Sequence, residues 1–256
     1  RLHPVDTVLG GMALYAFDKA KDVLRFYLDV SAGCPDELST AIALLTSPDG
    51  SPVVAFVVCY CGPMGDGEQV VQPVRSFGPP VVDEIKPMLY AAHQSIIDGA
   101  FPHGRQHYWK SGFASGLSAE GIEIMVDFMA RKPSPLTVCY LQQLHGAAAR
   151  VSPTETAFAH RADQFDFAIQ SQWEDSSAGE QNVAWTKAFF EAMQPDLEKA
   201  VYVNNLGEEG DERVRAAYGP NYDRLAALKN KYDPTNFFRL NQNINPEGER
   251  DSHTAQ

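Results

Sequence analysis

The sequence lacks the short motifs that identify several large classes of enzyme. It contains no Gly-x-Ser-x-Gly element, no His-Glu-x-x-His, no phosphate-binding Gly-x-x-x-x-Gly-Lys loop and no Cys-x-x-Cys pair. Each absence removes a local arrangement that its chemistry needs: a nucleophile elbow, a zinc-binding helix, a phosphate cradle or a redox dithiol. The seven histidines are scattered along the chain, so the sequence predicts no metal site.

Runs of basic residues and long apolar segments are also missing. The formal net charge is -12, from 33 acidic and 21 basic residues. Nucleic acids and anionic membranes are bound through clustered lysine and arginine, so we expect neither as a partner. No apolar stretch of the sequence reaches the length of a membrane-spanning helix.

Cysteine is scarce, and the four residues have no metal-binding or redox spacing. Cys59 and Cys61 flank Tyr60 in an apolar run and would share one face of a strand. The sequence allows buried free thiols or disulfides, and the spacing favours thiols in a reducing compartment. This interpretation predicts a cytoplasmic protein.

What the sequence does contain is enough apolar material for one substantial core, with 44% hydrophobic residues in a chain of 256. Alternating patterns predict strands over Thr7–Leu14, Leu38–Ser47, Pro52–Cys61, Tyr108–Phe113, Leu136–Leu144, Phe165–Trp173 and Ala200–Asn205. Helical spacing predicts helices over Phe17–Val30, Glu68–Ser76, Ala119–Arg131, Val183–Met193 and Arg213–Lys231. The combination predicts an α+β fold, an antiparallel sheet with helices packed on one face and the other face open for a ligand.

The most specific pattern lies close to the C-terminus, in Tyr232-Asp-Pro-Thr-Asn-Phe-Phe-Arg-Leu-Asn-Gln-Asn-Ile-Asn-Pro246. Pro234 cannot continue the preceding helix, so the helix is predicted to end there. Two adjacent aromatic residues and then the amides Asn241-Gln242-Asn243 follow. Buried amides must be hydrogen-bonded, which indicates a partner with a fixed array of donors and acceptors.

This stretch, together with Tyr202-Val-Asn-Asn205, resembles the berberine-bridge-enzyme-like, FAD-linked oxidases. In that family a Tyr-Asp-Pro-x-Asn-x-Phe-Arg-x-Asn-Gln-Asn-Ile ending returns the chain to the flavin domain, and a Tyr-x-Asn strand precedes it by one helix. Tyr108-Trp-Lys-Ser111 and Ala157-Phe-Ala-His-Arg161 extend the resemblance over most of the chain. The family's N-terminal half is not covered, since no glycine-rich flavin-pyrophosphate loop and no flavin-attachment motif is present.

The resemblance implies that residues 1–206 form a substrate-binding domain and that 207–256 form a C-terminal helix and a return segment. The return segment would reach an N-terminal FAD-binding domain of the same parent protein. The implied reaction is a two-electron oxidation of a small molecule, with hydride transfer to flavin N5, and the open sheet face would lie towards flavin and substrate. The isolated chain is expected to be inactive. The alternative is a stand-alone, non-catalytic ligand-binding or interaction domain.

Tyr202 and Asn204 lie two residues apart on a predicted strand and therefore share a face. The resemblance implies a catalytic role for Tyr202 and cofactor contacts for Asn204, Asn241 and Asn243. Family members often carry a second tyrosine, which can act as a base, at the fourth position of this motif. Here that position is Asn205, which cannot titrate, so we assign Asn205 to substrate binding instead.

Alternation and resemblance supply the remaining candidates. The candidate acids or bases are Tyr140, His145 and Tyr108, and the candidate substrate-binding residues are Gln142, Gln170 and Lys110. Tyr140 and Gln142 share one face of their predicted strand, whereas His145 belongs to the opposite face. For His145 the competing interpretation is a structural histidine, and for Lys110 it is a surface ammonium above its own apolar stem. The sequence leaves both alternatives open.

Overall fold

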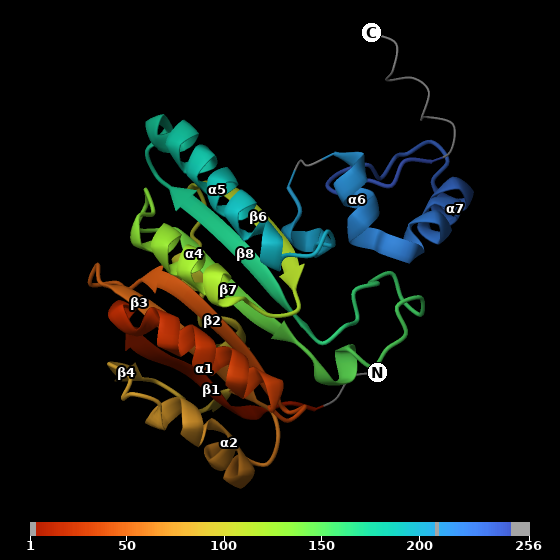
Figure 1. The fold of residues 1–256 in the computed structure, drawn as a ribbon. Coiled ribbons are helices and arrows are strands. Elements are labelled where there is room, and N and C mark those ends of the chain that lie inside the picture. The colour runs from red at the N-terminus through yellow and green to blue at the C-terminus, as the bar shows by residue number, and fades with distance from the viewer. Residues whose placement is uncertain (1–3, 208–209, 247–256) are drawn as a thin grey trace.

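The computed structural model describes residues 4–207 and 210–246 of the chain. In these ranges one antiparallel sheet of eight strands has the order β4-β1-β3-β2-β7-β8-β6, and β5 also pairs with β1 (Figure 1). The strands are β1 (Thr7–Ala16), β2 (Leu38–Thr46), β3 (Pro52–Tyr60), β4 (Val82–Asp83), β5 (Lys86–Leu89), β6 (Gln106–Ala114), β7 (Val138–Leu144) and β8 (Gln164–Trp173).

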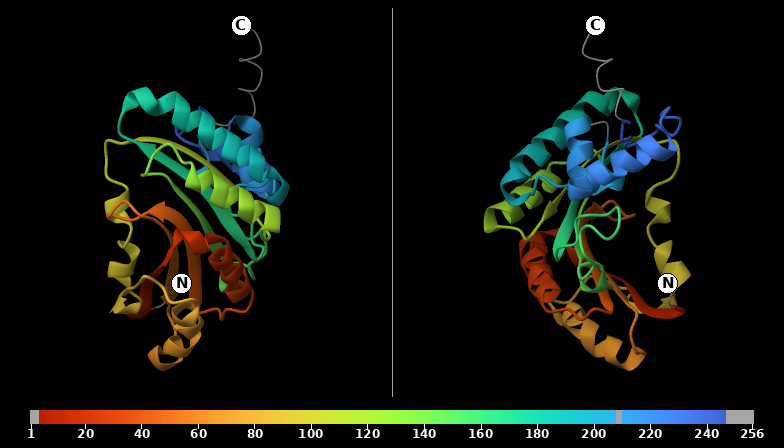
Figure 2. Two further views of the ribbon diagram at one scale, coloured as in Figure 1. Left: turned by 60° about the vertical axis from the view of Figure 1, so that its left-hand side comes forward. Right: turned by 90° about the vertical axis from the view of Figure 1, so that its right-hand side faces the viewer.

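The long helices cover one face of this sheet. The described helices are α1 (Ala20–Ala32), α2 (Met64–Ser76), α3 (Tyr90–Gln94), α4 (Ala119–Ala130), α5 (Gly179–Met193), α6 (Asp211–Tyr218) and α7 (Tyr222–Tyr232). α1 packs beside α4, and α4 beside α5, in a layer in front of the strands (Figures 1 and 2). The predicted α+β class, an antiparallel sheet with helices on one face, is confirmed.

The apolar side chains that alternate along the strands and those that form one face of each long helix pack together in one core. Phe165, Phe167 and Ile169 of β8 point to the same side and join Ile122 and Met125 of α4 in this core. The start of α4 is also as predicted, because the Ser118 side chain accepts a hydrogen bond of 2.9 Å from the backbone N–H of Gly121.

The strands predicted over Leu38–Ser47 and Pro52–Cys61 form a hairpin, since β2 and β3 pair from Leu38 opposite Tyr60 to Thr46 opposite Pro52. In its turn the Asp49 carboxylate accepts a 2.9 Å hydrogen bond from the N–H of Ser51.

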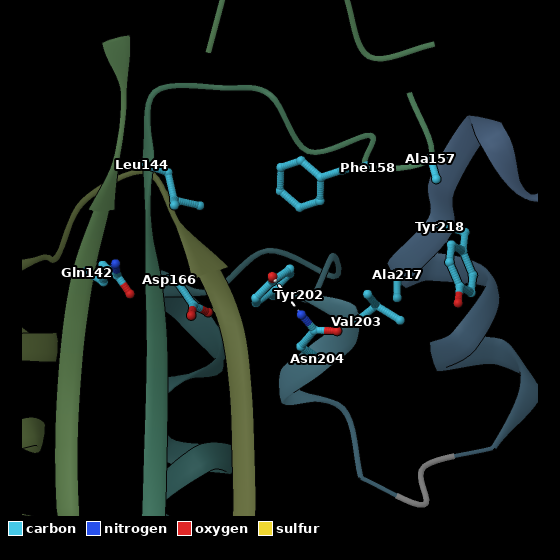
Figure 3. Close-up of a pocket in the computed structure, with 10 residues that line it drawn as sticks. All are labelled: Gln142, Leu144, Ala157, Phe158, Asp166, Tyr202, Val203, Asn204, Ala217 and Tyr218. Carbon is cyan, nitrogen blue, oxygen red and sulfur yellow. Dashed lines mark hydrogen bonds between the residues drawn. The ribbon is translucent and has the colours of Figure 1, made fainter. Parts of the chain in front are cut away.

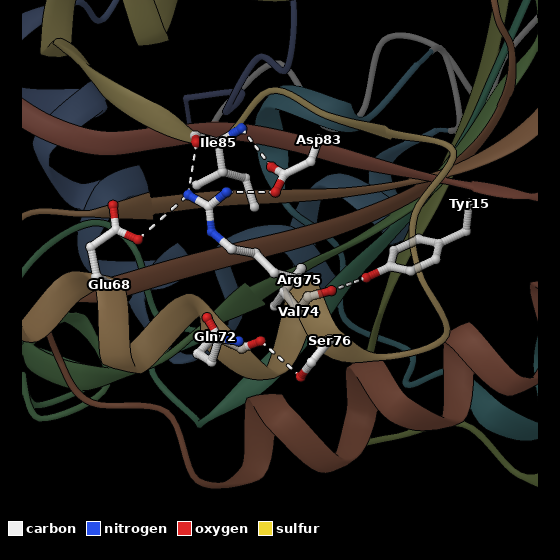
Figure 4. Close-up of polar contacts among 8 residues, drawn as sticks. All are labelled: Tyr15, Glu68, Gln72, Val74, Arg75, Ser76, Asp83 and Ile85. Carbon is white, nitrogen blue, oxygen red and sulfur yellow. Dashed lines mark hydrogen bonds and ion pairs between the residues drawn. The ribbon is translucent and has the colours of Figure 1, made fainter.

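The helix α2 is tied to the strand segment that follows it by Arg75 (Figure 4). The guanidinium pairs with Asp83 of β4 and donates to the carbonyl of Ile85 at 2.8 Å. The hydroxyl of Tyr15 on β1 donates to the carbonyl of Val74 in the same helix. These contacts fix the β1 edge of the sheet, and the neighbouring short helix α3 places His93 against Gly10 of β1.

The segment after β8 differs from the prediction in two places. Ala200–Asn205 is not a strand, because Val203–Asn205 forms a 3₁₀ turn. The predicted helix Arg213–Lys231 is two helices, α6 and α7, separated at Gly219, whose φ is 53°. A left-handed backbone angle at this position and the following Pro220 end α6.

A second, smaller apolar cluster joins these two helices to the preceding loop. Its buried members are Val201, Leu206, Val214, Ala217, Tyr222 and Ala226, with Ile244 of the return segment packed against them. The division of the chain between residues 206 and 207 stays a prediction. As predicted, the helix before Pro234 ends there, and the Asp233 carboxylate accepts hydrogen bonds from the N–H groups of Phe237 and Phe238.

The cysteines are free thiols in the described part of the chain, but their burial differs. Cys59 and Cys139 are buried as predicted, Cys34 is partly buried and Cys61 is exposed. The Sγ atoms of Cys59 and Cys61 lie 3.9 Å apart on the same side of the chain.

Candidate functional site

A pocket of about 550 Å³ lies where the open face of β7 and β8 meets the loop that leads to α6 (Figure 3). Its residues are Gln142, Leu144, Ala157, Phe158, Asp166, Tyr202, Val203, Asn204, Ala217 and Tyr218. Most of the wall is therefore apolar or aromatic. The polar groups stand in two places, Gln142 and Asp166 on the strands and Tyr202 with Asn204 on the loop.

Tyr202 and Asn204 lie side by side, although not for the reason that their spacing suggested. Because Val203–Asn205 is a 3₁₀ turn, the Asn204 amide folds back and donates to the Tyr202 hydroxyl oxygen at 2.7 Å. The Tyr202 ring packs edge-on against Phe158, with 5.8 Å between centroids. Since the hydroxyl oxygen accepts from Asn204, the phenolic proton can be donated to a ligand in the pocket.

At Asp166, which is part of the pocket wall, the structure brings together three polar side chains from three segments. Asp166 of β8 lies opposite Gln142 of β7 in the strand register, so both project from the open face. The Oδ2 atom of Asp166 accepts a hydrogen bond of 2.7 Å from the Asn205 amide and one of 3.4 Å from the Tyr140 hydroxyl. The Asn205 amide also lies 3.3 Å from the Tyr140 oxygen.

The residue Asp166 is 4% exposed, and its Oδ1 atom is buried without a hydrogen-bond partner in the described part of the chain. Burial raises the pKa of Asp166 to about 7, although the hydrogen bonds from Tyr140 and Asn205 act to lower the pKa. Burial and the nearby Asp166 carboxylate also raise the pKa of Tyr140. Near pH 7 the Asp166 carboxyl is therefore only partly protonated, while Tyr140 stays protonated.

The loop that carries Asn205 is held against the sheet by its backbone. Ser111, buried on β6, donates its hydroxyl to the Asn205 carbonyl at 3.3 Å. Arg213 of α6 donates to the carbonyls of Ser111 and Lys199. These contacts direct the Asn205 side chain onto the open face, where it reaches Asp166.

Not every residue predicted for the site lies at this pocket. Gln170 projects from the open face of β8, opposite Val138 of β7, further along the strand from Asp166. Tyr108 and Lys110 share a face, as predicted, but it is the face towards α5: the Lys110 ammonium lies 5.8 Å from the ring centroid of Phe190 on that helix.

His145 also lies away from the pocket. Its Nε2 atom is 2.8 Å from the Leu38 carbonyl oxygen, and its ring nitrogens are within 3.9 Å of the Cys34 Sγ atom. These partners are typical of a structural histidine at the start of β2.

Asn241 and Asn243, predicted to contact the cofactor, line a different pocket of about 490 Å³ beside the N-terminus of α6. Gln242 and Asn245 complete its row of amides. The Gln242 amide donates to the Leu206 carbonyl, while the Oδ1 atom of Asn243 is buried without a partner among the described residues. This pocket therefore offers amide donors and acceptors to a ligand, and the Oδ1 atom of Asn243 could accept one further hydrogen bond.

Sequence reasoning missed Asp166 and Phe158. A signal for Asp166 was present, because it is a carboxylate inside the apolar run Phe165–Ile169, on the same face as Gln170. Phe158 precedes the His-Arg pair, yet its contact with Tyr202 joins segments far apart in the sequence. No such contact can be read from spacing.

No group of three or more His, Cys, Asp or Glu side chains in the described ranges could hold a metal ion. Among the described helices, none has the length and apolar character needed to span a membrane.

Comparison with known proteins gives the class to which this fold and site belong. The family model described as berberine and berberine-like matches residues 188–245. A FAD-linked oxidoreductase of Dictyostelium discoideum is 30% identical over 250 residues, which are 96% of this chain and 54% of that protein.

Two solved structures have the same fold. 6-Hydroxy-D-nicotine oxidase from Arthrobacter nicotinovorans gives a TM-score of 0.76 at 21% identity, covering 94% of this chain and 55% of that chain. Berberine bridge enzyme from Eschscholzia californica gives a TM-score of 0.79 at 18% identity, covering 96% of this chain and 57% of that chain.

The chain belongs to the berberine-bridge-enzyme-like, FAD-linked oxidoreductase family, so the resemblance read from its motifs is confirmed. It spans about half the length of the curated relatives and solved structures that it matches. The alternative of a non-catalytic interaction domain gains no support from these relatives, which are named as oxidoreductases.

Proposed function

We propose that this chain is the substrate-binding part of an FAD-dependent oxidoreductase that oxidises a small organic molecule by two electrons. The observation that carries the proposal is the pocket on the open face, where Tyr202 with Asn204 stands across from Gln142 and Asp166 in an otherwise apolar wall. Apolar pockets with a few convergent polar groups are typical small-molecule sites. When bound, FAD would supply the acceptor for the substrate's hydride at its N5 atom.

The side chains of the return segment could bind the polar edge of the flavin ring. The amides of Asn241 and Asn243, including the unpaired Oδ1 atom of Asn243, offer the donors and acceptors that a polar ring edge would bind. No glycine-rich pyrophosphate loop occurs in this sequence. We therefore propose that Asn204, Asn241 and Asn243 contribute to a cofactor site whose larger part lies in a separate FAD-binding domain of the same protein.

Exposed apolar side chains on the return segment support such a domain partner. Phe237 and Phe238 are each 76% exposed, and Leu240 is 86% exposed. Contiguous exposed apolar residues of this size mark an interaction surface. In the proposed arrangement they pack against the FAD-binding domain and keep the open face directed towards it.

In this pocket the chain's own residues bind and orient the substrate. The Tyr202 hydroxyl, held by Asn204, donates a hydrogen bond to the reacting group, and Gln142 offers an amide from the facing strand. Phe158 and Leu144 exclude water from the same space. Exclusion of water strengthens each of these hydrogen bonds.

The proposal is tested by Tyr202→Phe in the complete flavoprotein. We expect anaerobic flavin reduction, followed by stopped-flow absorbance, to slow roughly ten- to a thousandfold, the range for one positioned hydrogen-bonding or acid–base group. The unfolding free energy should change by only about 1 kcal/mol, as for one lost hydrogen bond.

The matched control is Tyr222→Phe, which removes a phenolic hydroxyl from the second apolar cluster, outside the pocket lining. This variant should reduce its flavin at the wild-type rate. An unchanged reduction rate in Tyr202→Phe would remove Tyr202 from the site and leave Tyr140 as the phenol nearest to Asp166.

A further inference from the structure

We propose that Cys59 and Cys61 form a reversible dithiol–disulfide pair, a site of oxidation by hydrogen peroxide at the end of β3. Neither side chain lines the open-face pocket, so this site is independent of the proposed function. The spacing alone does not indicate it, since Cys-x-Cys differs from the Cys-x-x-Cys spacing typical of redox-active dithiols. The positions of the two sulfur atoms in the structure carry the inference.

The two thiols lie close together because of their place on the strand. Cys59 lies one residue before the end of β3, and the N–H of Cys61 extends the pairing with β2 by donating to the Glu37 carbonyl at 2.9 Å. Residues two apart on an extended segment project to the same side. The Sγ atoms are 3.9 Å apart, and in the described part of the chain each makes its hydrogen-bond contact with the other. A short movement brings them to the bonded separation of about 2 Å.

The backbone at this point allows a disulfide but strains it. Because a strand rises roughly 3.2–3.4 Å per residue, Cα atoms two residues apart are separated by about 6.6 Å. Disulfides span Cα separations of about 4.4–6.8 Å, so this pair lies near the upper end of the range. β3 ends at Tyr60 and the chain bends at Gly62, which leaves Cys61 room to adjust. A strained bond is more easily reduced than a structural disulfide, so the oxidation is reversible.

The two cysteines differ in exposure, and this difference assigns their roles. Cys61 is exposed, whereas Cys59 is 7% exposed. Burial, and then the neighbouring Cys61, raise the pKa of Cys59 to about 12. Cys59 is therefore a protonated thiol near neutral pH and is a poor nucleophile towards peroxide, because the thiolate is the reactive form. Cys61 is the thiol that peroxide oxidises first.

The oxidation takes place in two balanced steps. In the first, the Cys61 sulfur attacks hydrogen peroxide, the O–O bond breaks and an S–O bond forms, which gives the sulfenic acid of Cys61 and one water molecule. In the second, the Cys59 sulfur attacks the Cys61 sulfur, the S–O bond breaks and the S–S bond forms. The hydroxyl group leaves with the thiol proton of Cys59 as a second water molecule. Together the two sulfur atoms lose two electrons, and the peroxide oxygens gain them.

Oxidation of Cys61 also removes one of the two causes that keep Cys59 protonated. A sulfenic acid is neutral, so the charge of a Cys61 thiolate no longer opposes deprotonation of Cys59. The Cys59 Sγ atom already lies beside the sulfur atom that it must attack. The arrangement therefore leads to a disulfide in preference to further oxidation of Cys61 to a sulfinic acid.

The pair lies on the open face, near the β1 edge of the sheet and away from the pocket. Cys59 is opposite Gly10 in the register of β1 and β3. His93 of α3 covers Gly10 on this face, because a Cβ atom built at Gly10 would lie 2.8 Å from the His93 Nδ1 atom. β2 separates β3 from β7, which carries one wall of the pocket. Oxidation therefore leaves the pocket open, and its direct readout is the state of the two thiols.

Peptide mass spectrometry of the complete flavoprotein tests the pair without any substitution. Cleavage before Asp49 and Asp66 gives a peptide that contains Cys59 and Cys61 but neither of the other two cysteines of this chain. After treatment with hydrogen peroxide this peptide should be lighter by two hydrogen atoms, and dithiothreitol should reverse the change. A peptide that keeps both thiols, or that gains oxygen on Cys61 without forming the bond, would overturn the proposal.

Two single variants test the order of the steps. In Cys59→Ala the oxidation of Cys61 should stop at the sulfenic acid, which dimedone traps as a stable adduct. In Cys61→Ala the buried Cys59 should form no such adduct under the same conditions. Equal trapping at the two positions, or trapping at Cys59 alone, would contradict the assigned roles.

Cys34→Ala is the matched control. Cys34 is also a partly accessible thiol, but its Sγ atom contacts Gln143 at 3.1 Å and His145 at 3.9 Å instead of a second cysteine. This variant should form the disulfide between Cys59 and Cys61 at the wild-type rate and to the wild-type extent. Loss of the disulfide in Cys34→Ala would show that oxidation passes through Cys34, which would refute the inference.

Discussion

Asp166 is 4% exposed and has no ion-pair partner in the described part of the chain, so this one residue makes the unfolding free energy depend on pH. The pKa of Asp166 is about 7 in the folded protein, against about 3.9 for an unfolded aspartate. Between these values the folded state binds more protons than the unfolded state, so the unfolding free energy falls as pH rises. The contribution is fully present below about pH 4 and is lost as pH passes through the folded pKa.

Urea unfolding between these pH values measures the effect. Because one pKa unit corresponds to about 1.4 kcal/mol, the wild type should lose up to roughly 4 kcal/mol across the window through this group. Asp166→Asn should have a flatter dependence, and the exposed Asp163→Asn should follow the wild type. Equal slopes in wild type and Asp166→Asn would show that Asp166 has an ordinary pKa in the folded state.

The residue scale also explains which part of the site the sequence could predict. Tyr202 and Asn204 were paired correctly by spacing, yet they touch through a 3₁₀ turn and not on a strand face. The importance of Asp166 depends on burial and on contacts with Asn205 and Tyr140, 39 and 26 residues away. Periodicity within one strand contains no information about such contacts.

At the scale of elements, the break between α6 and α7 is the feature with the clearest energetic consequence. Gly219 has a φ of 53°, and a Cβ atom built there would lie 3.5 Å from the Ala159 Cβ atom. The carbonyl of Ala217 just before it accepts a 2.9 Å hydrogen bond from His160 if Nε2 carries the proton. The break therefore turns Tyr218 towards the pocket and joins α6 to the loop before β8.

Gly219→Ala should destabilise the chain by roughly 1–2 kcal/mol, because an L-residue is strained at this backbone angle. Gly99→Ala is the matched control, since a Cβ atom added at Gly99 would meet no described atom within 4 Å and the φ of Gly99 is not in the left-handed region. Chemical denaturation measures both. A Gly219→Ala variant as stable as Gly99→Ala would mean that the helix break does not depend on glycine.

The sequence predicted elements well where local chemistry decides the structure. The Asp-Gly turn formed the hairpin of β2 and β3, and Ser118 capped α4. Prediction from the sequence failed where tertiary contacts determine the local structure. Short alternation over Ala200–Asn205 suggested a strand, although this segment runs past the edge of β6, and Gly219-Pro220 was included in a helix although both residues signal its end.

At the scale of the whole molecule, helices pack on one face of the sheet (Figures 1 and 2). The other face carries the pocket (Figure 3). Phe237 and Phe238, on the segment that follows α7, are exposed. The family, the described sheet and the position of the pocket support a proposal in which an FAD-binding domain completes the site. Residues 247–256 of the predicted return segment lie outside the described residues.

Anaerobic mixing of the complete, FAD-loaded protein with an aromatic alcohol tests the central claim most directly, by following the absorbance of the oxidised flavin. The account predicts bleaching in the wild type and bleaching roughly ten- to a thousandfold slower in Tyr202→Phe, because the Tyr202 hydroxyl is the group proposed to hold the reacting end of the substrate. An alcohol that binds in the pocket while the flavin stays oxidised at every pH would contradict the claim that the open face is the substrate site of an oxidoreductase.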